Sequence, residues 1–152
     1  MDVENWTIEK ALKIGAEMEL ESYKLYTETA KKAKYPSAKK LLEEIAADEK
    51  KHREYFLNGL KNPSHLKLRT IQKEIPDLKI TDQLVNIPLD PKADYPQILI
   101  FAAQREKATH DFYVNIALKL KDTDLGKVFD NFAKEELRHK YLLEKDESLR
   151  LY

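Results

Sequence analysis

The sequence predicts an all-α protein, a four-helix bundle of two repeated helical hairpins joined by a long crossover. Three observations support this fold class. Only three of the 152 residues are glycine and 36% are charged, a composition rich in helix-forming Lys and Glu. Four stretches carry apolar residues at the three- and four-residue spacing of a helix. Polar residues within the first two stretches recur 87 positions later in the other two.

The first hairpin contains two predicted helices. The first helix runs from about Thr7, a suitable N-cap, to Lys34, where a proline follows closely. The second helix begins near Ser37 and ends near Gly59, because glycine is favoured just beyond a helix C-terminus.

The second hairpin repeats these boundaries. Its first helix begins after Asp94, which can cap it while a proline lies in the first turn, and its second runs from about Asp124 to Glu147. The 87-residue offset aligns Thr7 with Asp94 and Ser37 with Asp124. Helix starts therefore repeat together with the polar residues, which favours duplication.

The connection between the hairpins, about residues 61–93, contains four of the six prolines. Its length lets the third helix run parallel to the second, and it permits two chains to exchange hairpins. A short helix at about 64–73 and irregular or extended structure at about 79–88 are predicted within it. The predicted organisation is one domain over 1–152, with hairpins at about 7–60 and 94–147.

Composition excludes several classes of function. The formal net charge is zero, so nothing indicates a nucleic acid or membrane partner. No run approaches the roughly 18 apolar residues of a transmembrane helix, and the start lacks a signal pattern. The lack of cysteine excludes disulfides, thiol catalysis and iron–sulfur centres. We expect a cytoplasmic protein, and its Lys- and Glu-rich composition is typical of a thermophile.

A Glu-x-x-His motif occurs in the second and fourth predicted helices, and each motif follows another glutamate by thirty positions. The six residues are Glu19, Glu49, His52, Glu106, Glu136 and His139. Tyr26 and Tyr113 each follow the first glutamate of their half by seven positions. All of these residues interrupt apolar stripes, so we expect them to face the bundle centre.

Four glutamates in a bundle centre repel one another, and one unpaired buried charge costs several kcal/mol. Two divalent cations would neutralise four carboxylates, and two neutral imidazoles would complete the coordination. Protonation or ordered water could instead resolve the charge without a metal. The doubled pattern favours the binuclear metal site.

At these residues the chain resembles the rubrerythrin group of ferritin-like di-iron carboxylate proteins. The matching stretches are Glu19–Tyr26, Asp48–His52, Glu106–Tyr113 and Glu135–His139. One glutamate from each of two helices, with Glu-x-x-His from each of the other two, is the ligand pattern of that superfamily. The resemblance implies a ferritin-like bundle that binds two iron ions, with manganese as an alternative and zinc able to occupy a purified sample.

The resemblance also implies roles for individual residues. Glu19 and Glu106 would be terminal ligands, Glu49 and Glu136 would bridge the ions, and His52 and His139 would each bind one ion.

Several further residues are candidates for supporting roles. Asp48 and Glu135 can each reach the outer N–H of the histidine four positions later on the same helix, or face solvent. Tyr26 and Tyr113 can hydrogen-bond a ligand carboxylate or supply an electron, or they can simply pack. His110 is either an extra ligand or a partly exposed histidine.

Small residues precede the glutamates of the first and third helices by about one turn. They are Gly15, Ala16, Ala102 and Ala103. They would leave a path for O2 or peroxide, but close helix packing explains them better. His65 is predicted to lie at the surface of the crossover.

Two departures from the rubrerythrin pattern bear on function. The 152 residues contain no rubredoxin-like four-cysteine domain, which implies that electrons come from a separate donor such as a rubredoxin-like protein. Thr109 stands where rubrerythrins carry an additional glutamate, and Ser22 is its counterpart. The site therefore has a symmetric set of six ligands, closer to the bacterioferritin type.

The resemblance implies a redox enzyme that reduces hydrogen peroxide or O2 with electrons from the separate donor. The alternatives are a ferroxidase or iron-handling protein and, less favoured, a metal-free helical interaction module. A homodimer, with hairpins exchanged or not, is the expected assembly.

Overall fold

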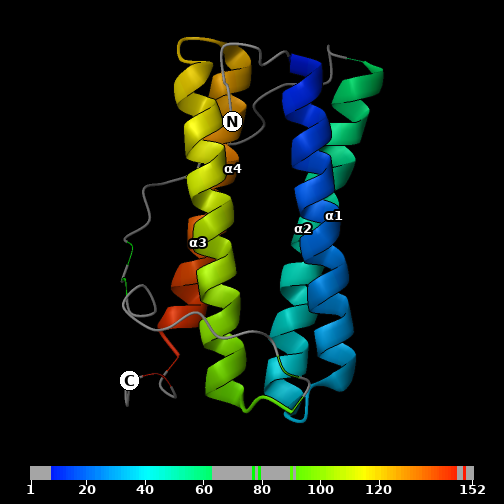
Figure 1. The fold of residues 1–152 in the computed structure, drawn as a ribbon, viewed down its shortest axis with the longest axis vertical. Helices are drawn as coiled ribbons and strands as arrows, with labels where there is room; N and C mark the ends of the chain where they lie inside the picture. Colours follow the sequence, from blue (N-terminus) through cyan, green and yellow to red (C-terminus); the bar gives the residue numbers. More distant parts are fainter. Residues whose placement is uncertain are drawn as a thin grey trace.

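The computed structural model describes residues 8–62, 77, 79, 90, 92–146 and 149. Its helices are α1 (Ile8–Lys32), α2 (Pro36–Lys61), α3 (Tyr95–Lys119) and α4 (Asp124–Glu144). The helices pack as two antiparallel hairpins, α1 with α2 and α3 with α4, and α2 runs in the same direction as α3 (Figure 1). No strand occurs in the described residues, so the predicted all-α bundle is confirmed. Within the same residues, no helix has the length and apolar content needed to cross a membrane.

The second hairpin has well-defined caps. The Asp94 side chain accepts a hydrogen bond from the Gln97 backbone N–H at 2.9 Å, and the Gln97 side chain accepts one from the Asp94 backbone at 3.0 Å. Thr123 caps α4 by accepting from the Gly126 backbone N–H at 3.0 Å. A Cβ at Gly126 would lie only 2.2 Å from the Leu120 carbonyl oxygen, so this turn requires glycine.

The first hairpin departs from the predicted boundary at the end of α2. This helix continues past Gly59 to Lys61 and is capped by Asn62, whose N–H donates to the Asn58 carbonyl at 2.9 Å. The predicted end near Gly59 lies within two residues of the observed one, but Gly59 does not terminate the helix, because no described glycine has the positive φ of a glycine C-terminal cap. The Thr7 cap, the 64–73 helix and His65 lie outside the described residues.

The core forms two clusters that flank the polar centre of the bundle. The polar residues predicted to face the bundle centre are buried, and so are the apolar residues that flank them. One cluster is mainly aliphatic and includes Leu42, Ile45, Ala102 and Leu143. The other is rich in aromatic rings and includes Phe56, Tyr113, Phe129 and Phe132. The polar centre is therefore closed at both ends by apolar side chains.

A second group of charges lies buried within the α3–α4 hairpin. The fully buried Lys140 ammonium donates to Glu144 at 2.8 Å and to Asp77 at 2.5 Å, and Lys107 donates to Asp77 at 2.9 Å. Burial opposes the ionised form of Asp77, but the two lysines lower the pKa of that carboxyl to about 2. Asp77 therefore fixes this point of the crossover against α3 and α4.

Candidate metal centre

The six residues that the sequence singles out lie together between the two hairpins. They form two groups, and within each group one ligand atom per residue lies within 4.8 Å of the others. The first group is Glu19, Glu49, His52 and Glu136, and the second is Glu49, Glu106, Glu136 and His139. The glutamates of the two Glu-x-x-His motifs belong to both groups, the position that bridging ligands take.

Helix geometry explains why these side chains converge. All six are buried, and each interrupts an apolar stripe near the middle of its helix. Residues three apart share a helix face, so the glutamate and histidine of each motif both point inward. Four helices thus bring four carboxylates and two imidazoles into one interior space.

The donor atoms fit a metal centre. Among the described residues, several buried atoms of the cluster have no hydrogen-bond partner: Glu19 Oε2, Glu49 Oε1, both carboxylate oxygens of Glu106, Glu136 Oε2 and His139 Nδ1. A buried polar atom without a partner costs about 1–3 kcal/mol, and more when it is charged. Carboxylate oxygens and imidazole nitrogens are the ligands that iron and manganese accept. Divalent cations would satisfy these atoms together.

The pKa values of the cluster also indicate that its buried carboxylates favour bound positive charge. Burial and the neighbouring carboxylates raise the pKa of Glu49 and of Glu106 well above the usual range. Burial alone would lower the pKa of the two histidines, but the surrounding carboxylates raise it well above the usual value. Protons are therefore held in this cluster, and a metal ion that binds here must release them.

A carboxylate holds the outer nitrogen of each histidine, but across the bundle rather than along one helix. His139 Nε2 lies 2.9 Å from Asp48 Oδ2, and His52 Nε2 contacts Glu135. The predicted same-helix pairs, Asp48 with His52 and Glu135 with His139, are wrong. Each imidazole extends away from its own backbone, so its outer nitrogen reaches the facing helix. Nδ1 then faces the ligand carboxylates, with the nearest oxygen 3.1 Å from His52 and 3.4 Å from His139.

The two tyrosines have different partners. The Tyr113 hydroxyl donates to Glu19 Oε1 at 2.5 Å, across the boundary between the hairpins. The Tyr26 hydroxyl donates to the backbone carbonyl of Ala102 at 3.5 Å. Both side chains are fully buried. Of the roles considered from the sequence, the hydrogen bond to a ligand carboxylate thus exists for Tyr113, whereas Tyr26 contacts backbone.

Hydroxyl-bearing residues stand where rubrerythrins carry an additional glutamate and at the matching position of the first hairpin. Ser22 Oγ accepts a hydrogen bond from the Arg105 guanidinium at 3.1 Å, and Thr109 donates to the Arg105 carbonyl at 3.2 Å. His110 lies 3.1 Å from the Asp111 carboxylate and belongs to neither group of candidate ligands. Among the described residues, the six residues of the two groups remain the candidate ligands.

Close packing accounts for one of the small residues near the site. A Cβ at Gly15 would lie 2.9 Å from the Phe56 ring, so the missing side chain makes room for that ring. This agrees with the packing interpretation of the small residues.

One feature missed in the sequence is an aromatic wall on one side of the centre. The 87-residue register pairs Tyr55, Phe56, Phe129 and Phe132 with Leu142, Leu143, Leu42 and Ile45. The Phe132 ring lies edge-on to the His52 imidazole, with centroids 4.7 Å apart. The same register comparison that reveals the ligands would have revealed this difference. Two equivalent ligand sets therefore have unequal surroundings.

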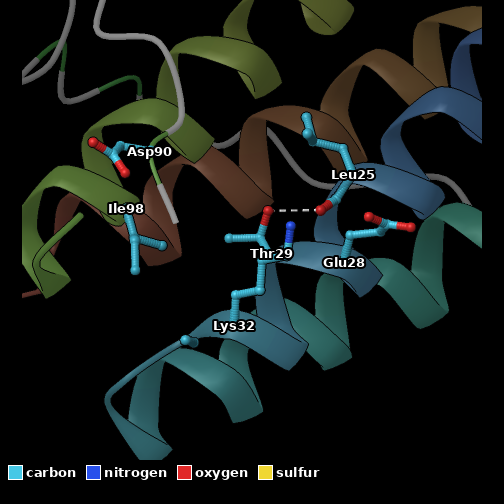
Figure 2. Close-up of a pocket in the computed structure, with 7 residues that line it drawn as sticks. Leu25, Glu28, Thr29, Lys32, Asp90 and Ile98 are labelled. Carbon is cyan, nitrogen blue, oxygen red and sulfur yellow. Dashed lines mark hydrogen bonds between the residues drawn. The ribbon is translucent and has the colours of Figure 1, made fainter. Parts of the chain in front are cut away.

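A pocket of about 170 Å³ lies near the end of α1, beside the start of α3 (Figure 2). Leu25, Glu28, Thr29, Asp90 and Ile98 line it, among others. The Thr29 hydroxyl donates to the Leu25 carbonyl at 2.7 Å. None of the candidate ligands lines this pocket, so it is separate from the centre.

Comparison with known proteins agrees with this geometry. The rubrerythrin family model matches residues 3–60, which include α1, all but the last residue of α2, and the candidate ligands of the first hairpin. No curated protein and no solved structure gives a significant match. Over its first hairpin the chain is thus similar to the rubrerythrin family, and the four-helix architecture fits that similarity.

Proposed function

We propose that this protein is a non-haem di-iron, or di-manganese, redox enzyme that reduces hydrogen peroxide or O2 with electrons from a separate donor protein. The observation that carries the proposal is the set of buried carboxylate and imidazole atoms without partners between the hairpins. Two divalent ions would satisfy these atoms, and the family match supports iron.

The chain's own residues prepare the site for such ions. Asp48 and Glu135 hold the outer N–H of the histidines, so that each Nδ1 is available as a ligand. The Tyr113 hydroxyl oxygen lies 2.5 Å from Glu19 Oε1, so its hydrogen bond fixes the orientation of that carboxylate and holds a proton against it. The apolar clusters at both ends exclude bulk water. When bound, the metals would polarise the O–O bond and deliver the two electrons that, with two protons, convert hydrogen peroxide to two waters.

Iron oxidation for storage or detoxification is the second candidate. Ser22 and Thr109 supply hydroxyls where a seventh carboxylate would stand, and this symmetric six-ligand set favours a ferroxidase. In that case Fe(II) is the substrate and has to leave the site after oxidation. The two candidates predict different behaviour of the iron after one turnover.

The decisive experiment loads the protein anaerobically with Fe(II) and then titrates separate samples with peroxide and with O2. The proposal expects about two irons per chain, rapid stoichiometric oxidation, and recovery of the reduced spectrum with both irons retained when a donor is added. Release of oxidised iron and uptake of more Fe(II) would support the ferroxidase instead.

A matched pair of variants controls for adventitious iron. Glu49→Gln should lose iron binding, whereas Glu44→Gln, at an exposed position of the same helix, should retain it. No bound iron in the parent protein, together with higher stability of Glu49→Ala, would favour the metal-free helical module.

A further inference from the structure

The two groups of candidate ligands are equivalent in composition but not in hydrogen bonding. The 87-residue register relates Glu19 to Glu106 and His52 to His139, and both groups share the same two central glutamates. The sequence therefore predicts two equal sites. Two glutamates and two histidines belong to only one group each, and their hydrogen bonds differ between the two groups.

On the side of the cluster formed by Glu106 and His139, the ligand atoms have the fewest hydrogen bonds to other protein groups. Among the described residues, neither oxygen of Glu106 has a hydrogen-bond partner, and nor does His139 Nδ1. The Glu106 Oε2 and His139 Nδ1 atoms lie 3.5 Å apart, beyond a good hydrogen bond. A cation placed here would gain three ligand atoms for which the protein supplies no close hydrogen-bond partner.

The side formed by Glu19 and His52 is already partly satisfied by the protein. Glu19 Oε1 accepts the hydroxyl of Tyr113 at 2.5 Å, and His52 Nδ1 lies within hydrogen-bond distance of Glu136 Oε1, at 3.1 Å. A cation bound by His52 Nδ1 must displace that contact. The counterpart of Tyr113 gives the other side no such hydrogen bond, because Tyr26 donates to a backbone carbonyl.

We infer that the two sites bind metal in a fixed order. The first ion binds beside Glu106 and His139, together with the shared glutamates, and the second binds beside Glu19 and His52. A hydrogen bond to a charged group contributes about 1.5 kcal/mol or more, so the second site should bind at least about tenfold more weakly. This inference rests on the proposed metal centre and adds the order in which it fills.

The test is anaerobic calorimetric titration of the metal-free protein with Co²⁺. The wild type should show two steps with Kd values that differ at least about tenfold. Glu19→Gln should keep the tight step and lose the weak one, and Glu106→Gln should do the reverse. These positions form a matched pair, because both are buried glutamates related by the register. Circular dichroism checks that each variant folds.

A second matched pair guards against a variant that fails to fold. His52→Gln should remove the weak step, and His139→Gln should remove the tight one. Two indistinguishable steps in the wild type, or equal losses in paired variants, would overturn the order while leaving the metal centre intact. Absence of any Co²⁺ binding would overturn the proposed function itself, and the binding order with it.

Discussion

Replacing Glu106 by glutamine should make the metal-free protein more stable than the wild type, and the metal-loaded protein less stable than the wild type. Both oxygens of Glu106 are buried without a partner among the described residues. Glutamine has nearly the same shape, carries no charge, and can donate its amide hydrogens to the surrounding carboxylates. The penalty for an unsatisfied buried polar group is about 1–3 kcal/mol, so the metal-free variant should be more stable than the wild type by about that amount.

Metal should reverse this order. A ligand that binds only the folded state at 100 times its Kd raises the free energy of unfolding by about 2.7 kcal/mol. The wild type would gain about this amount at its tight site, and the variant would lose most of it because a charged ligand is missing. The wild type should therefore become the more stable protein in excess Co²⁺.

Urea unfolding followed by circular dichroism, once in EDTA and once in anaerobic Co²⁺, measures both effects. Glu44→Gln is the control, because this exposed glutamate on α2 should change neither value by more than about 0.5 kcal/mol. The reasoning would be refuted if Glu106→Gln destabilised the metal-free protein by 1 kcal/mol or more. That result would mean that the protein already satisfies the carboxylate.

Three further predictions concern the packing, the buried ion network and the outer carboxylates. Gly15→Ala should lower the free energy of unfolding by up to about 2 kcal/mol, because about 1–3 kcal/mol of overpacking outweighs about 1 kcal/mol of helix propensity. Adding Phe56→Leu should recover part of this loss in urea unfolding, and a more stable single variant would refute the clash. Asp77 has a pKa of about 2 against an ordinary 3.8, so its stabilising effect should be full above about pH 4 and disappear as the pH falls through 2. The stability of Asp77→Asn, measured in urea across this range, should approach that of the wild type at the acid end, and a gap independent of pH would contradict the assignment. Asp48→Asn should weaken Co²⁺ binding in calorimetry by about 10- to 100-fold, because the outer nitrogen of His139 loses its carboxylate, and unchanged binding would show that the contact does not orient the ring.

The helices and the inward-facing residues could be predicted because both depend on local patterns. Apolar residues at helical spacing define the buried stripes, and the 87-residue register distinguishes the ligand residues from the many other glutamates. Asp94 was identified as a cap because a short polar side chain before a proline is a strong local signal. The end of α2 was misjudged because Gly59 adopts ordinary helical geometry, which its residue type does not reveal.

Contacts between helices could not be predicted from spacing. Asp48 lies four positions before His52, which suggested a contact along α2, but the carboxylate instead reaches His139 on α4. Spacing along one helix shows which residues share a face, but it does not show how far a side chain extends across the bundle. Tyr26 and Tyr113 have identical register positions, and only the three-dimensional packing separates their partners.

The packing at the two ends of the bundle explains how equal ligand sets acquire unequal surroundings. On the aromatic side, Phe56 fills the space left by Gly15, and its ring centroid lies 6.0 Å from that of Tyr113. The register places Leu143 and Ala102 at the corresponding positions of the other side, a smaller side chain matched with a larger one. Such exchanges conserve volume and are tolerated in cores, so the two ends can differ without loss of the fold. The same register positions therefore have different apolar neighbours on the two sides, and of the two tyrosines Tyr113 contacts a candidate ligand carboxylate whereas Tyr26 contacts backbone.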